Sequence, residues 1–199
     1  MTSNTIGAVI LAAGRSQRMG RPKLVLPWGN KTVIEHITTT LIQAGIEEIL
    51  LVTGGAREQV EQALSAYNVK FAYNPHYETS GMITSLQIGI YSSDPTLDAL
   101  LVVLGDQPVM QTEVIHLITQ AFYLHRPRLV IPSYQMRRGH PWLIEKSLWE
   151  KILEMPAEAT LRDFLQRYQQ DILYVPVNTA TILQDMDTPD DYQHLKPEG

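Results

Sequence analysis

The stretch Ile6–Lys23, IGAVILAAGRSQRMGRPK, decides the fold of this chain. Its apolar run over 8–11 predicts a buried strand, and the small residues that follow predict a loop. Gly14 and Gly20 permit backbone conformations that a side chain would block, so successive N–H groups can turn toward one anion. The loop also gathers cations in a chain of formal net charge -5, at Arg15, Arg18, Arg21 and Lys23. This pattern indicates a phosphate-binding loop whose ligand is a nucleoside triphosphate.

Two known phosphate loops are excluded by the spacing. The segment contains neither G-x-x-x-x-G-K-[ST] nor G-x-G-x-x-G, so it is typical of neither a P-loop ATPase nor a dinucleotide-binding domain. The alternative is structural, because glycine-rich turns follow strands in many α/β proteins and basic loops are often merely solvated. We expect a phosphate loop of a different type over residues 11–23.

Composition places the chain among ordinary globular proteins. Its 199 residues suit a single domain, with 44% hydrophobic and 19% charged residues. The absence of cysteine excludes disulfides and thiolate metal sites, so any metal is held by oxygen or imidazole. The N-terminal apolar run is too short for an export signal or a membrane span, which predicts a cytoplasmic protein with no membrane partner. Net acidity and the lack of a basic stripe predict no nucleic-acid partner.

Apolar runs alternate with helical periodicity along the chain, which predicts a single-domain, Rossmann-like three-layer α/β/α fold with a mainly parallel sheet. The expected strands are 7–11, 48–53, 69–73, 99–104, 129–132 and 172–175. The expected helices begin at 33, 58, 81 (near Ser80) and 112, and a capping box of Thr160 and Asp163 precedes another. A hairpin turn at 135–139 with a returning strand at 142–144 predicts a small antiparallel addition to the sheet. We expect the region of about 134–170 to form a lid or acceptor platform.

Asp106 is the first candidate metal ligand. It follows the most apolar predicted strand, at the end where open α/β sheets bind ligands. Mg²⁺ prefers carboxylate, phosphate and water oxygens and usually takes one or two protein ligands. The alternative is a turn residue or a helix N-cap. Metal ligation is the role we expect for Asp106.

Asp187 is the second candidate metal ligand. Asp185 can take its place if the local strand is shifted by one turn of the pleat. The alternative is again a cap, because Asp187-Thr188-Pro189 can begin the terminal helix. Thr188 is then the N-cap, and Asp190 and Asp191 fit the first turn, where carboxylates interact favourably with the helix dipole.

Two loop cations are assigned to the phosphates. Arg18 offers a planar fork that suits the β- and γ-phosphates, and Lys23 is a compact charge that suits the α-phosphate. Arg15 and Arg21 are expected at the surface.

The motifs together resemble one family. LAAGRSQRMGRPK over 11–23 resembles the signature L-A-A-G-x-S-x-R-M-G-x-x-K of nucleotidyltransferases related to the molybdenum cofactor cytidylyl- and guanylyltransferases. Four more segments match the pattern of these nucleotidyltransferases in the same order along the chain: Asn74-Pro75 with GMITS at 81–85, GDQP at 105–108, RGHP at 138–141 and DMDTPDD at 185–191. The resemblance therefore spans nearly the whole chain.

The resemblance implies roles for individual residues. Asp106 and Asp187 share the Mg²⁺ ion. Base and ribose contacts come from Leu11, Ala12, Ala13 and Gly14, together with Gly81 and Ser85 at a predicted helix N-terminus. Ala13 favours CTP, because guanylyl-transferring relatives typically have L-A-G-G at this place. For the segment 81–85 an ordinary capped helix is the alternative, above all for Thr84.

Histidine and tryptophan carry weaker expectations. His140 in Arg138-Gly139-His140-Pro141 is a candidate contact for the anionic acceptor, and its alternative is a hydrogen-bonded surface residue. The other histidines show no metal-ligand spacing. The tryptophans, Trp28, Trp142 and Trp149, are expected to pack in the fold rather than to stack on a pterin.

The implied activity is transfer of CMP from CTP to the terminal phosphate of molybdopterin or its metal-loaded form, with release of pyrophosphate. A molybdenum hydroxylase apoenzyme is a possible recipient of the product. Three alternatives stay open at this point. They are a guanylyltransferase, a sugar- or alcohol-phosphate nucleotidyltransferase, and a chaperone that holds the cofactor without chemistry.

Overall fold

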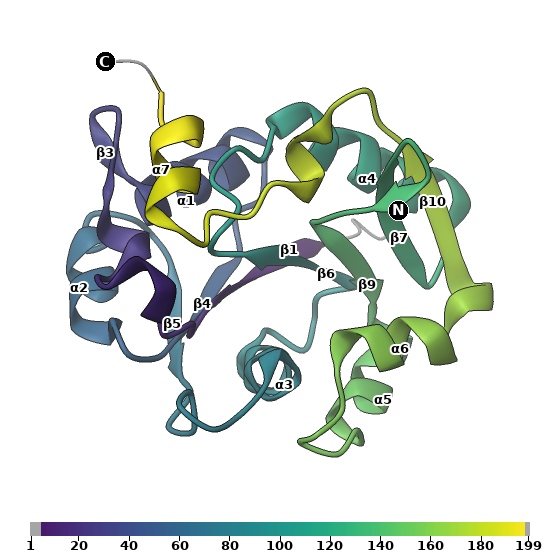
Figure 1. Ribbon diagram of the computed structural model, residues 1–199. Coiled ribbons are helices and arrows are strands. Elements are labelled where there is room, and N and C mark those ends of the chain that lie inside the picture. Colours follow the sequence, from purple (N-terminus) through teal and green to yellow (C-terminus); the bar gives the residue numbers. More distant parts are fainter. Residues whose placement is uncertain (1–4, 198–199) are drawn as a thin grey trace.

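The fold is built around β1 (Ile6–Ala12), all seven residues of which are buried. In this computed structural model, which describes residues 5–197, β1 pairs in parallel with β6 (Ala99–Leu104) on one side and β4 (Ile49–Thr53) on the other (Figure 1). A strand flanked on both edges and covered on both faces needs apolar residues throughout, which explains the uninterrupted run in the sequence. The predicted first strand is confirmed.

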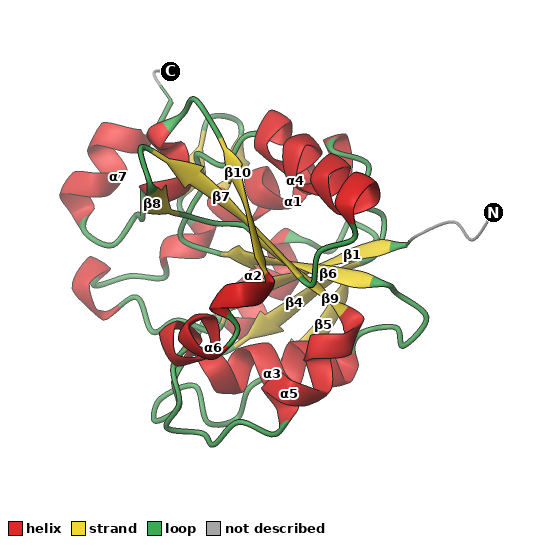
Figure 2. Cartoon of the chain, turned by 90° about the vertical axis from the view of Figure 1, so that its right-hand side faces the viewer, coloured by secondary structure: helices red, strands yellow, loops and turns green. Residues whose placement is uncertain are grey.

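The described chain forms one large sheet with strand order β10-β7-β9-β6-β1-β4-β5, and β8 pairs with β7 (Figure 2). The remaining strands are β5 (Lys70–Tyr73), β7 (Leu129–Tyr134), β8 (Arg137–Arg138), β9 (Trp142–Glu145) and β10 (Ile172–Pro176). Only β8 and β9 run antiparallel to their neighbours in it. The short strands β2 (Pro27–Trp28) and β3 (Lys31–Thr32) form a separate antiparallel pair. The predicted, mainly parallel α/β fold is confirmed.

The predicted antiparallel addition is confirmed in β9, which lies inside the sheet between β6 and β7. Trp142 pairs with Val102 of β6, and Ile144 pairs with Leu129 of β7. A local hairpin pattern predicts pairing between sequence neighbours, whereas burial of three consecutive apolar residues favours an interior place. The lid or acceptor role of the region 134–170 stays a prediction; Met136, in the turn that precedes β8, is 97% exposed. Gln135 and Met136 form this turn with left-handed φ values of 49° and 62°.

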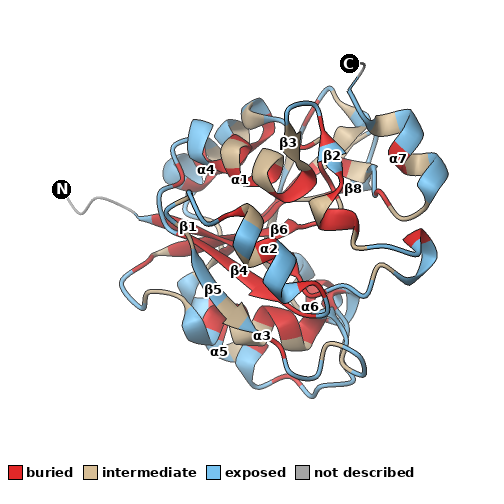
Figure 3. Cartoon of the chain, turned by 90° about the vertical axis from the view of Figure 1, so that its left-hand side faces the viewer, coloured by how far each residue is buried: buried red, intermediate tan, exposed pale blue. Residues whose placement is uncertain are grey.

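Helices cover both faces of the sheet, as Figure 1 shows. One face carries α1 (Val33–Gln43), α2 (Arg57–Ala63), α4 (Thr112–His125) and α7 (Pro189–Leu195), and the other carries α3 (Met82–Ser92), α5 (Trp149–Leu153) and α6 (Leu161–Arg167). Alternate β1 side chains enter the two cores. Ile10 packs in the first and Val9 in the second, and both are fully buried. Figure 3 shows the central strands coloured mostly as buried. No helix of the described residues is long and apolar enough to cross a membrane.

Capping explains where several helices begin. The predicted box of Thr160 and Asp163 starts α6, and Thr188 with Asp191 forms another at α7. The predicted N-cap role of Thr188 is therefore confirmed. Helix α3 begins at Met82, one residue after the predicted start at 81; Gly81 is its N-cap, and no side chain of the described residues caps it. The three tryptophans are buried, as predicted.

Candidate active site

The carboxyl ends of β1 and β6 meet at one edge of the sheet, where the Gly105 N–H donates to the Leu11 carbonyl at 3.1 Å. A cavity of about 300 Å³ opens at this edge. It is lined by Leu11, Ala12, Gly14, Arg15, Ser16, Gln17, Arg18, Lys23, Leu24, Gly105, Asp106 and Asp187. Most of the predicted site residues therefore share one cavity, at the place where open α/β sheets bind ligands.

The phosphate loop turns at two left-handed positions, Ser16 with φ 49° and Gly20 with φ 65°. We expected Gly14 to need this conformation, but its φ is not left-handed. The Ser16 side chain then fixes the end of the loop, because its Oγ accepts from the Lys23 N–H at 3.2 Å. Within residues 5–197, the N–H groups of Gly14, Arg15 and Ser16 have no protein acceptor. They are free to bind an anion.

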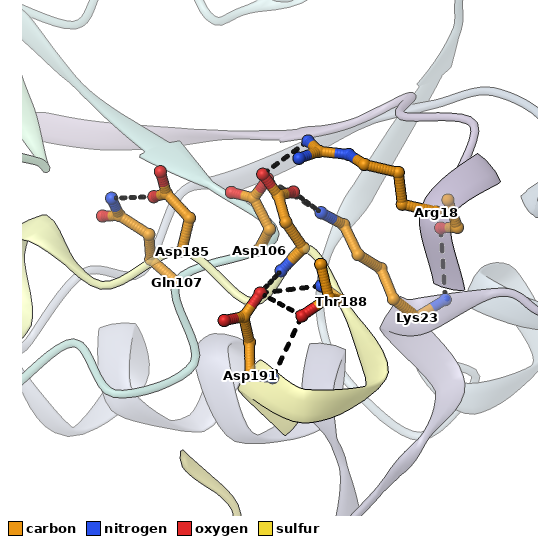
Figure 4. A network of polar contacts seen from close by, with 9 residues as sticks. Arg18, Lys23, Asp106, Gln107, Asp185, Thr188 and Asp191 are labelled. Atoms are coloured by element: carbon orange, nitrogen blue, oxygen red, sulfur yellow. Dashed lines mark hydrogen bonds and ion pairs between the residues drawn. The ribbon is translucent and has the colours of Figure 1, made fainter. Parts of the chain in front are cut away.

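Lys23 contacts both predicted metal ligands. Figure 4 shows its side chain extending toward Asp106. Its Nζ is 2.9 Å from Asp106 Oδ2 and 3.0 Å from Asp187 Oδ1. The Lys23 side chain is only 10% exposed, so this cation is held in a partly desolvated position. Asp106 lies 83 positions and Asp187 lies 164 positions after Lys23 in the sequence, yet both contact its ammonium group.

Arg18 approaches the same cluster from the solvent side. Its Nη2 is 2.6 Å from Asp187 Oδ2, so both oxygens of this carboxylate have a cationic partner. Partial burial opposes ionisation of Asp187, but the hydrogen bond and charge of Lys23, followed by those of Arg18, outweigh it and lower the pKa of Asp187. Asp187 is therefore ionised at neutral pH and available to a cation.

A third carboxylate, Asp185, faces a different partner. Its Oδ1 accepts from Gln107 Nε2 at 2.7 Å. Burial raises the pKa of Asp185; the Gln107 bond opposes this effect, and the charges of Asp106 and Asp187 add to it. Asp187, not Asp185, shares Lys23 with Asp106. Sequence reasoning overlooked Gln107, although its place in the GDQP motif, directly after Asp106, was a signal.

The donor set at this edge fits a hard divalent cation. Two carboxylates already converge on the Lys23 ammonium, which marks a position suited to positive charge. The described chain contains no group of three or more His, Asp or Glu residues that could hold a metal by itself. Mg²⁺ commonly binds through one or two carboxylates and completes its shell with phosphate and water. Asp106 and Asp187 would hold it here.

Three predicted nucleotide contacts lie outside this cavity. Ala13 is buried with its carbonyl against Gly54, where a Cβ would approach the Ala13 oxygen to 2.6 Å. Ser85 is also buried, and its Oγ accepts from Asn74 Nδ2 at 3.0 Å. Gly81 lines a second, mostly apolar cavity of about 480 Å³ between α3 and the segment before α6. Their nucleotide contacts stay predictions.

Arg15 and Arg21 are exposed, as predicted. Arg15 lines the cavity while its Nη1 donates to the Glu78 carbonyl at 3.1 Å. Arg21 is not among the residues that line this cavity, and its guanidinium lies 5.9 Å from the centre of the Tyr192 ring.

His140 is not in the cavity that holds Asp106. Its ring stacks on Trp142 with centroids 4.4 Å apart, and its Nε2 is enclosed with no hydrogen-bond partner among residues 5–197. The backbone is fixed as well, because His140 N–H donates to the Ile182 carbonyl at 3.1 Å. Burial lowers the pKa of His140 to about 4. The acceptor contact stays a prediction, and the alternative of a hydrogen-bonded surface side chain does not fit this packing.

This enclosure predicts a loss of stability in mild acid. Between its ordinary pKa of 6.5 and about 4, the unfolded state binds a proton at His140 that the folded state does not. The free energy of unfolding should therefore fall as the pH drops through this window. In His140→Phe, which retains a stacking ring, we expect the loss between pH 7 and 4.5 to be smaller by about 2 kcal/mol. Urea unfolding at both pH values tests this, and equal losses in the two proteins would contradict it.

The chain matches the model of the MobA-like NTP transferase domain over residues 8–172. It is 28% identical over 190 residues to the molybdenum cofactor cytidylyltransferase of Escherichia coli K12, covering 95% of this chain and 94% of that one. It is 27% identical over 200 residues to the nicotine blue oxidoreductase of Paenarthrobacter nicotinovorans, covering 96% of each. Similarity to these two relatives alone therefore does not determine the substrate.

The fold is also similar to a solved structure, that of Rv0371C from Mycobacterium tuberculosis H37Rv in complex with manganese. The TM-score is 0.83 at 23% identity, with 97% of this chain and 98% of that chain covered.

Proposed function

We propose that this protein transfers CMP from CTP to the terminal phosphate of a molybdopterin-type acceptor and releases pyrophosphate. The chain belongs to the MobA-like NTP transferase family and is a nucleotidyltransferase, and the proposal specifies its nucleotide and its acceptor. The observation that carries this proposal is the convergence of Asp106, Asp187, Lys23 and Arg18 beside a loop with free N–H groups. Such a site neutralises a triphosphate and aligns it for displacement.

The charges at the site suit this chemistry. Attack of one phosphate on another brings two anions together, so catalysis depends on neutralisation and in-line positioning. Arg18 can grip two phosphate oxygens with its fork, and the loop N–H groups can bind others. Lys23 lines the same cavity as both carboxylates and would respond to the negative charge that develops at the α-phosphate. A bound Mg²⁺ would supply further neutralisation and orientation.

The acceptor itself is the nucleophile in this proposal. A terminal phosphate is ionised at neutral pH, so its oxygen attacks the α-phosphorus directly while the bond to the bridging oxygen of pyrophosphate breaks. Neither a general base nor a covalent intermediate with the protein is required. A molybdenum hydroxylase apoenzyme would be the recipient of the resulting dinucleotide.

CTP is favoured by the L-A-A-G sequence of the loop, and by the cytidylyltransferase that shares nearly the full length of the chain. Thermal unfolding with CTP, GTP, ATP or UTP, each with Mg²⁺, tests this preference. We expect CTP to raise the melting temperature most, by roughly 3–5 °C at saturating concentration. Stabilisation by GTP alone would contradict the cytidylyl assignment.

The transfer is tested by incubating the protein with each triphosphate, Mg²⁺ and molybdopterin, and then measuring pyrophosphate and the mass of the product. We expect pyrophosphate release and a product that carries CMP. Persistent absence of pyrophosphate with every triphosphate would support a chaperone that only binds the cofactor.

A further inference from the structure

We propose that Asp191 is a positioning residue that holds the Asp187 carboxylate beside Asp106, in addition to capping α7. This inference rests on the proposed function, because it assigns Asp191 a task in the same metal–nucleotide site. Asp187 lies in the segment 184–187, which has no regular secondary structure. No helix or sheet pairing fixes its backbone, so individual contacts must do so.

One oxygen of Asp191 accepts three of these contacts. Its Oδ2 accepts from the Asp187 N–H at 3.0 Å, from the Thr188 N–H at 2.8 Å and from the Thr188 hydroxyl at 2.8 Å. Figure 4 shows the contacts between Asp191 and Thr188 as dashed lines. A capping box needs only the bond to the N-cap N–H, here that of Thr188. The bond to Asp187 lies one residue farther upstream and is not part of the cap. It ties the backbone of the candidate ligand to the first turn of the helix.

A second set of contacts ties the same segment to the end of β6. Met186 N–H donates to the Asp106 carbonyl at 2.7 Å, and the Met186 side chain is fully buried. Beside it, Gln107 Nε2 donates to Asp185 Oδ1 at 2.7 Å. Asp187 is thus anchored from both sides, by Asp191 and by the residues around Asp106. This arrangement keeps both carboxylates within reach of one cation, now Lys23 Nζ.

Asp190 provides a matched control within the same helical turn. It is the neighbour of Asp191 and also lies in the first turn of α7, so both carboxylates interact with the helix dipole. In the part of the chain that the structure describes, the Asp190 side chain has no hydrogen bond or ion pair. Removing either carboxylate takes one negative charge from the first turn of α7, but only loss of Asp191 removes the hydrogen bond to the Asp187 N–H.

The test is the affinity of the full chain for Mn²⁺, measured by titration calorimetry without nucleotide or acceptor. We expect Asp191→Ala to weaken Mn²⁺ binding about tenfold or more, as is common when a partner of a metal ligand is removed. We expect Asp190→Ala to stay within about threefold of the unchanged protein. Asp191→Asn keeps an acceptor oxygen and should restore most of the affinity, which separates positioning from charge.

Thermal unfolding without metal shows whether each variant is folded. If Asp191→Ala does not fold, Gln107→Leu removes the side-chain contact of the second anchor at similar volume and should also weaken Mn²⁺ binding, by several-fold, because the Met186 N–H bond remains. Equal Mn²⁺ affinities of folded Asp191→Ala and Asp190→Ala would overturn the positioning role. So would a failure of the unchanged protein to bind Mn²⁺.

Pyrophosphate release tests the proposed transfer activity separately from the positioning role of Asp191. Weakened Mn²⁺ binding in Asp191→Ala, with no pyrophosphate from any triphosphate, would support the positioning role and refute the transfer. Normal Mn²⁺ binding in that variant, with active transfer by the unchanged protein, would refute the positioning role alone.

Discussion

Asp106→Asn is expected to lower the rate of pyrophosphate release by roughly 1,000-fold. Asn retains the size of the side chain but loses the charge that a divalent cation requires, and it loses the ion pair with Lys23 at 2.9 Å. The Asp106 side chain is 28% exposed and not part of the hydrophobic core, so the fold should persist. Steady-state pyrophosphate release and far-UV circular dichroism measure the two effects.

The matched control is Asp190→Asn, which makes the same chemical change at a carboxylate outside the cavity. It should retain activity within about twofold. A folded Asp106→Asn protein with full activity would refute the metal role of this residue and return it to the alternative of a turn residue.

Lys23→Met should slow turnover about 100-fold while changing the dissociation constant of CTP only a few-fold. Met keeps the length and apolar stem of Lys without its charge. The Lys23 ammonium contacts two carboxylates in the free protein, so it gains little when a nucleotide first binds. Its largest contribution is expected where negative charge develops during transfer. Single-turnover rates measure the effect on the transfer step, and equilibrium binding of CTP measures the effect on nucleotide affinity.

Arg21→Met is the control for Lys23, because it removes another cation of the same loop, one that faces Tyr192 rather than the cavity. Both rate and affinity should stay near those of the unchanged protein. A Lys23→Met protein that loses CTP affinity but turns over normally once saturated would assign Lys23 to ground-state binding.

Much of the fold was predictable, because burial on both faces leaves a direct trace in the sequence. The apolar runs of β1, β4 and β6 and the box of Thr160 with Asp163 were all found from local patterns. The place of β9 was not. Its pairing with β6 joins Trp142 to Val102, a long-range contact that no local pattern encodes.

The site was predictable where a motif holds a residue at the end of a strand, as for Asp106. The convergence of Asp187 on Lys23 depends on contacts between distant segments, such as Met186 N–H with the Asp106 carbonyl. The role of Asp191 was equally hidden, because a capping box predicts its bond to Thr188 but not the one to Asp187. The turn at Ser16 was missed because glycine is the usual residue at such a φ.

A crystal structure of the protein with Mn²⁺ and a non-hydrolysable CTP analogue, with anomalous data collected for manganese, would show whether one cation joins the two aspartates to the triphosphate. We expect one strong manganese peak within coordination distance of Asp106 and Asp187, with the triphosphate against the Gly14–Ser16 backbone and Lys23 turned toward it. A manganese peak away from both aspartates, or a triphosphate bound elsewhere, would contradict this expectation.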